Sequence, residues 1–226
     1  MAKPKEEWRH LALLVSLLLL FIVTPMAALL RHGILIINVV SAAVLIAATY
    51  ALSERKPIFV GAVLLSGISI VGTWLLLSTQ QRWVAVLSHS FVVVLILYFS
   101  IAILGYVLRS GKVTMDRIFA AICVYLLMGY AWTFSYALVE ELQPSAFVAL
   151  SPVPPNDYVA SVLQLRYISF MTLTTVVYGD IAPRSPAART LVGLEAVTGQ
   201  IYLTVLVARL VGLHIAHAQT SPSRED

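Results

Sequence analysis

A run of nine residues that mixes hydroxyl, apolar and carboxylate side chains lies in the C-terminal part of this otherwise apolar chain: Thr172-Leu173-Thr174-Thr175-Val176-Val177-Tyr178-Gly179-Asp180. It closes the segment 160–173, which we interpret as a helix too short to cross a bilayer, and a full apolar stretch follows at 187–213. Non-helical backbone is tolerated at membrane depth only where it is buried in protein or lines water. The half-length helix, the non-helical run and the full span therefore predict a re-entrant loop beside a pore.

Glu195 is a second candidate, because an ionisable residue inside a membrane span suggests a functional role. Its side chain faces either the protein behind the run or an aqueous cavity, and we favour hydrogen bonding on the protein side. The sequence contains no nucleophile–base constellation, phosphate-binding loop or H-E-x-x-H motif, so we expect neither an enzyme nor a cofactor.

Composition places the chain in a membrane. Hydrophobic residues make up 60% of its 226 residues, charged residues only 12%, and the mean hydropathy is +0.90. Soluble domains carry about 25% charged residues. The net charge of +4 comes with no basic patch outside the loops and chain ends, so we do not expect a nucleic acid partner.

Six apolar stretches approach or exceed the roughly 20 residues that a helix needs to cross the hydrocarbon core. The first of them follows basic residues as a signal peptide would, but its length favours a retained helix. The stretches are 11–30, 34–52, 58–78, 83–108, 118–139 and 187–213.

The distribution of Lys and Arg predicts the orientation of these spans. With the N-terminus inside, the larger share of the 15 basic residues lies on the inner side, as the positive-inside rule requires. We therefore expect both termini to be cytoplasmic, with a four-helix region over 1–112 and a pore domain over 113–226. The residues assigned to outer segments are Arg31, Arg82, Arg166, Arg184 and Arg189.

The run 172–180 resembles the signature of potassium-channel selectivity filters, T-x-T-T-V-G-Y-G-D, with Val177 in place of the first filter glycine. The resemblance extends over about 115–213 and is to small bacterial channels of the two-transmembrane pore superfamily. It implies an all-α membrane protein with six transmembrane helices, a re-entrant pore helix and a filter loop, assembled as a four-fold homotetramer. The flanking residues that share it are Tyr167, Ser169, Pro183, Arg189 and Gly199.

The resemblance also implies a role for each residue of the run. A dehydrated cation needs its water oxygens replaced, and four chains supply rings of backbone carbonyls that do so. The permeant ion is then a monovalent cation, with K⁺ favoured, and no other metal is expected. The filter is Thr175, Val176, Val177, Tyr178 and Gly179; Asp180 lies at the outer mouth, Thr172 and Thr174 support the pore helix, and Glu195 and Gly199 form a hinge or gate in the inner helix.

Val177 is the departure from the family pattern. The glycine that it replaces adopts a positive φ, where a β-branched residue is an outlier at a cost of roughly 1–2 kcal/mol per chain. We therefore expect the backbone to leave the usual path here, with the Val176 and Val177 peptides rotated and potassium selectivity or conduction weakened. The alternative is a scaffold that has adapted to valine through Met171 and the packing behind Tyr178.

The remaining expectations concern regulation. The stretch 83–108 holds no Lys or Arg, so voltage sensing by gating charges is not expected. Arg109, Lys112 and Arg117 are expected on the inner surface, in contact with anionic lipid headgroups. We expect a bacterial plasma membrane protein, and a non-conducting structural or regulatory subunit is the alternative to a channel.

Overall fold

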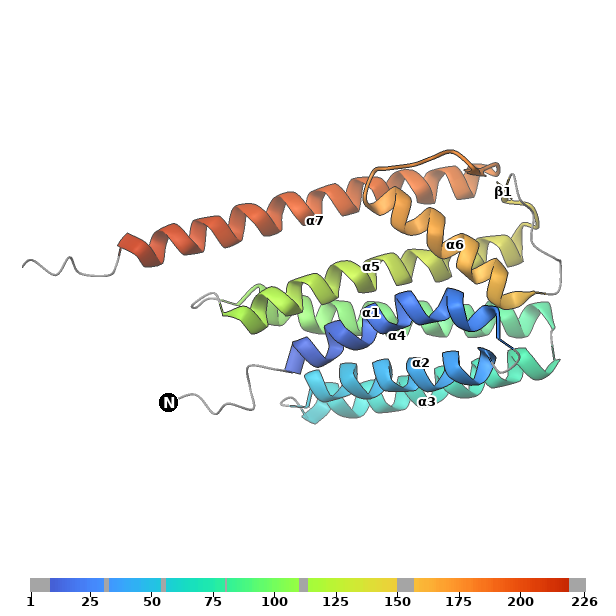
Figure 1. Ribbon diagram of the computed structural model, residues 1–226, viewed down its shortest axis with the longest axis horizontal. Helices are drawn as coiled ribbons and strands as arrows, with labels where there is room; N and C mark the ends of the chain where they lie inside the picture. Colours follow the sequence, from blue (N-terminus) through green and yellow to red (C-terminus); the bar gives the residue numbers. More distant parts are fainter. Residues whose placement is uncertain are drawn as a thin grey trace, which may run out of the picture.

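The computed structural model describes residues 9–30, 33–53, 56–79, 81–109, 114–149 and 157–219, and Figure 1 shows how the elements in these ranges are arranged. Consecutive long helices run up and down beside one another, as the short breaks between the apolar stretches predict. The elements are α1 (Arg9–Ala28), α2 (Gly33–Ala51), α3 (Lys56–Thr79), α4 (Arg82–Val107), α5 (Met115–Leu142), β1 (Phe147–Ala149), α6 (Tyr158–Leu173), β2 (Ile181–Pro183) and α7 (Pro186–Gln219).

The apolar stretches all form helices, and within the described ranges 5 of these are long and apolar enough to cross a membrane. These are α1, α3, α4, α5 and the part of α7 from Pro186 to Arg209. The apolar part of α2, Leu35–Ala51, falls below that length. The chain is therefore an integral membrane protein, and a spanning role for α2 stays a prediction.

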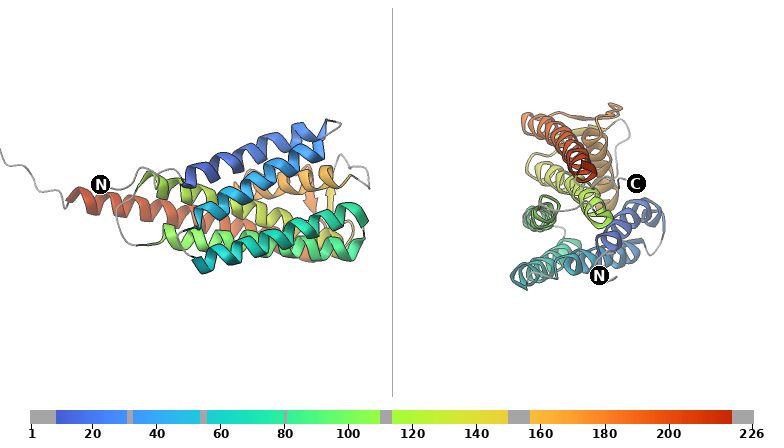
Figure 2. Two further views of the ribbon diagram at one scale, coloured as in Figure 1. Left: turned by 90° about the horizontal axis from the view of Figure 1, so that it is seen from below. Right: turned by 90° about the vertical axis from the view of Figure 1, so that its left-hand side faces the viewer.

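Helix α5 lies at the centre of the bundle, where it contacts α1, α4, α6 and α7. The pair α2–α3 lies on one side of the bundle and α7 on the other, in both the side view and the end view (Figures 1 and 2). Helix α4 packs along α5, α1 packs against α2 and α5, and α6 is inclined across α5 and α7. Buried apolar side chains join these helices, for example Leu13 and Leu17 of α1, Ile103 of α4 and Val124 of α5.

A strand pair that the sequence did not predict lies between α5 and α7. Strands β1 and β2 are antiparallel, with Val148 opposite Ala182. The turn before β1 is held by Glu140, whose carboxylate accepts hydrogen bonds from the backbone N–H groups of Ser145 at 2.7 Å and Phe147 at 3.1 Å. The segment after 172–180 is thereby attached to the end of α5 in the same chain.

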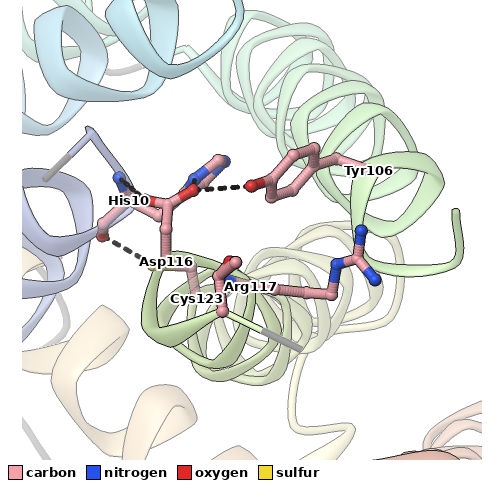
Figure 3. Close-up of polar contacts among 6 residues, drawn as sticks. His10, Tyr106, Asp116, Arg117 and Cys123 are labelled. Atoms are coloured by element: carbon pink, nitrogen blue, oxygen red, sulfur yellow. Dashed lines mark hydrogen bonds and ion pairs between the residues drawn. The ribbon is translucent and has the colours of Figure 1, made fainter. Parts of the chain in front are cut away.

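A buried polar cluster joins the beginnings of α1 and α5 to the end of α4 (Figure 3). His10 Nδ1 lies 2.7 Å from Asp116 Oδ2, and the Tyr106 hydroxyl donates to the same oxygen at 2.9 Å. The His10 and Tyr106 rings stack with centroids 4.8 Å apart. Arg117 is only 9% exposed and its guanidinium lies 5.9 Å from the centre of the Tyr106 ring. Contact of Arg109 and Arg117 with lipid headgroups stays a prediction. Lys112 lies outside the described residues.

Candidate functional site

The short helix α6 begins at a side-chain cap and ends beside the run 172–180. Asp157 Oδ1 accepts a hydrogen bond from the Ala160 N–H at 2.9 Å, which satisfies one of the amide groups that a helix start leaves without a partner. After Leu173 the chain turns back, and the Val176 N–H donates to the Met171 carbonyl at 2.9 Å. The predicted short helix followed by a non-helical run is therefore present.

The backbone of this run alternates in conformation. The φ angles of Thr175, Val177 and Gly179 are 62°, 35° and 81°, whereas Val176 and Tyr178 between them are not in the positive-φ region. In a regular strand successive carbonyl groups point in opposite directions, whereas φ angles that alternate in sign can turn them to the same side. Such alternation is the geometry expected if the carbonyl oxygens are to face one side.

Val177 remains at positive φ, so the expectation that valine leaves this region is wrong, while the expected rotation of the Val176 and Val177 peptides stays a prediction. The physical reason lies in its neighbours: the Val177 N–H approaches the Met171 carbonyl at 3.4 Å, and the Val176 N–H donates to the same carbonyl at 2.9 Å. These contacts fix the peptides on both sides of Val176. The surrounding structure thus holds a residue that would by itself avoid this region.

The side chains of the run are open on the side away from the bundle. Val176, Val177 and Tyr178 are 50%, 56% and 72% exposed in a single chain. The threonines before them differ: Thr172 is buried, whereas Thr174 is exposed and its hydroxyl donates to the Phe170 carbonyl at 2.7 Å. In one chain, therefore, Tyr178 is not packed behind the run.

Asp180 is tied back to α6 at the end of the run nearest β2. The Tyr167 hydroxyl donates to Asp180 Oδ1 at 3.2 Å. Arg189, at the start of α7, donates from Nε to the Pro183 carbonyl at 3.3 Å. Tyr167 therefore contacts the run directly, whereas Arg189 contacts Pro183 in the segment that follows it.

Glu195 lies behind α6, completely buried, which agrees with the favoured expectation of hydrogen bonding on the protein side. The Tyr136 hydroxyl of α5 donates to its Oε2, and Ser169 Oγ of α6 lies 2.6 Å from its Oε1. Ser169 Oγ also lies 2.8 Å from the Gly129 carbonyl oxygen. One carboxyl group thus joins the three helices that support the run.

Gly199 marks the closest approach of α7 to the end of α6. A Cβ atom on this residue would lie 2.9 Å from both the Leu173 carbonyl oxygen and Leu173 Cδ1. The absence of a side chain is therefore required for packing at this point. The C-terminal part of α7 has a separate attachment, because the Arg209 guanidinium donates to the Arg109 carbonyl at 3.2 Å and also to the Leu108 carbonyl.

Arg166 was assigned to an outer segment from the distribution of basic residues, and this prediction is wrong because the side chain lies inside the bundle. It is 7% exposed, and its guanidinium donates to the Phe21 carbonyl at 3.2 Å and approaches the Leu20 carbonyl at 3.5 Å. Pro25 of α1 has no N–H, so the carbonyl four residues earlier, that of Phe21, has no helical partner. Proline in α1 thereby provides the acceptor that Arg166 of α6 uses.

Comparison with known proteins identifies part of the chain. Residues 137–214 match a family model described as ion channel, whose domain is of the two-transmembrane potassium-channel type. The match runs from the last residues of α5 through α6 and the run 172–180 into α7. Neither a curated protein nor a solved structure matches the chain.

Proposed function

Because residues 137–214 carry an ion-channel domain of the two-transmembrane potassium-channel type, we propose that the protein conducts monovalent cations through a filter formed by Thr175, Val176, Val177, Tyr178 and Gly179. The observation that carries the proposal is the re-entrant helix α6, which ends in backbone with positive φ at every second residue. Rings of such carbonyls replace the hydration shell of a cation.

The proposed channel is a homotetramer. Each chain supplies one filter strand, so a closed ring of carbonyl oxygens requires further copies around an axis. The exposed faces of Val176 and Tyr178 would then be covered by neighbouring chains, and Asp180 would add negative charge at the outer mouth. In this arrangement the pore domain lies at the centre and α1 to α4 surround it, in a bacterial plasma membrane with both termini cytoplasmic.

The proposed selectivity is for K⁺ over Na⁺, but weaker than in a filter with glycine at position 177. A valine at φ 35° lies in a region that only glycine occupies freely. Its side chain, 56% exposed, adds apolar bulk next to the carbonyl of Val176. The same observation favours the second candidate function, a channel-like subunit that does not conduct.

Ion flux from purified protein in liposomes tests the proposal. We expect potassium efflux that exceeds sodium efflux under equal gradients, and a larger ratio in Val177→Gly. The matched control is Gly193→Ala, since a Cβ at Gly193 has no neighbour within 4 Å. If neither cation moves while native mass spectrometry finds an intact four-chain particle, the non-conducting alternative holds. A monomer or dimer as the largest particle contradicts the tetramer.

A further inference from the structure

A partly open cavity of about 440 Å³ lies between the four N-terminal helices, α5 and α6. Its volume is in the range of pockets that bind small ligands, about 300–1,000 Å³. Most of its lining side chains are apolar, which is typical of such pockets. Every helix from α1 to α6 contributes to it, including Leu20, Ser41, Ser69, Tyr130, Val162 and Arg166.

The guanidinium of Arg166 is the charged group of this cavity. Its hydrogen-bond partners include the carbonyls of Leu20 and Phe21 and the neutral hydroxyl of Tyr130, and it lies 4.8 Å from the centre of the Phe21 ring. None of the carboxylates in the described ranges forms an ion pair with it. Carbonyl dipoles stabilise a cation but do not neutralise its charge. A buried charge without a counter-ion is unfavourable.

Ser69 of α3 is a second polar residue that lines the cavity, and its hydroxyl is not used in a hydrogen bond within the described part of the chain. Its side chain is 5% exposed. A buried hydroxyl without a partner costs about 1–3 kcal/mol. The cavity thus combines an apolar wall, a positive charge and an unused hydroxyl.

We propose that this cavity binds a fatty acid, with its carboxylate on Arg166 and its hydrocarbon chain along the apolar wall. A carboxylate supplies the missing counter-ion, and a guanidinium binds it through two parallel hydrogen bonds. The limited volume fits a single chain better than a two-chain phospholipid. The bound fatty acid would contact α1 and α3 at the same time as α6, and so would join the N-terminal helices to the helix that supports the filter.

Photo-crosslinking of the purified protein tests this assignment, with a diazirine-bearing palmitate as the probe and peptide mapping as the readout. We expect labelled residues along the cavity lining, and competition by unlabelled palmitate at concentrations at least about tenfold lower than by hexadecanol, which has the same chain without the charge. Labelling confined to residues outside the lining overturns the proposal, as does equal competition by the two compounds.

Substitutions separate the apolar wall from the charge. Ser69→Phe fills the cavity and should reduce labelling about tenfold, whereas Ile68→Phe, at a neighbouring position that is 45% exposed, should not change it. Arg166→Gln should abolish the preference for palmitate over hexadecanol, and Arg166→Lys should retain it. If Ser69→Phe leaves the labelling unchanged, the cavity is not the binding site. Cation flux is measured separately, so this inference can fail while the channel function holds.

Discussion

Replacement of Glu195 by glutamine tests the carboxyl group that joins α5, α6 and α7. Three oxygen–oxygen contacts meet there: Tyr136 with Glu195, Ser169 with Glu195 at 2.6 Å, and Ser169 with the Gly129 carbonyl at 2.8 Å. Each hydroxyl carries one hydrogen, so the two hydroxyls supply two of the three that are needed. The third is available if Glu195 is a neutral acid that donates to Ser169, which in turn donates to Gly129.

Glutamine reproduces this pattern. Its N–H₂ group donates to Ser169 and its carbonyl oxygen accepts from Tyr136, so Glu195→Gln should change the free energy of unfolding by less than about 1 kcal/mol. Glu195→Ala leaves both hydroxyls without their partner and creates a cavity in a fully buried site. Lost partners cost about 1–3 kcal/mol, and removing buried side-chain volume adds to that cost.

Thermal and denaturant unfolding of the purified protein, followed by tryptophan fluorescence, measures these differences. Leu194→Ala, at a neighbouring position that is 49% exposed, is the control for substitution in α7. The reasoning is refuted if Glu195→Gln destabilises the protein as strongly as Glu195→Ala. That result would mean that a negative charge is required at this site and that the count of hydrogens is wrong.

Three further predictions follow from packing, burial and charge. Gly199→Ala should destabilise the protein by about 1–3 kcal/mol in the same unfolding assay, because its Cβ would lie 2.9 Å from Leu173, whereas Gly193→Ala should be neutral or slightly stabilising. Asp116→Asn should cost about 1–3 kcal/mol, because His10 and Tyr106 contact both carboxylate oxygens and an amide offers only one oxygen as an acceptor. His10→Gln in the same background should cost much less than it does alone. Single-channel recording should find an open probability that is nearly constant between negative and positive potentials. Each gating charge would contribute about 2.3 kcal/mol per 100 mV, and α4 has no Lys or Arg beyond its first residue. Steep voltage dependence would contradict this prediction.

Local sequence signals predicted the elements of this fold well. The helices and the short helix α6 depend on apolar stretch length and on breaks between stretches, which are visible in one dimension. The position of the run 172–180 followed from its own residues and from their place after a half-length helix. In each of these cases the relevant contacts are close in the sequence.

Contacts between residues that are far apart in the chain could not be predicted from the sequence. Arg166 was assigned to an outer segment because a charge in a membrane protein is ordinarily found at the surface, and its acceptors are about 145 residues earlier in the chain. A strand as short as β1 has no alternation from which it could be recognised. The positive φ of Val177 depends on contacts with Met171 and not on the preference of valine.

The contact between Arg166 and the carbonyls near Pro25 has a consequence for how the chain is made. Arginine is among the most unfavourable residues to insert into a membrane, at about 2.5–3.5 kcal/mol at the centre of a helix. Helix α1 is synthesised long before α6, and its Phe21 carbonyl has no helical partner. The first helix thus provides a hydrogen-bond acceptor before α6 is made, so a chain that lacks α1 should insert α6 less efficiently even though the run 172–180 is intact.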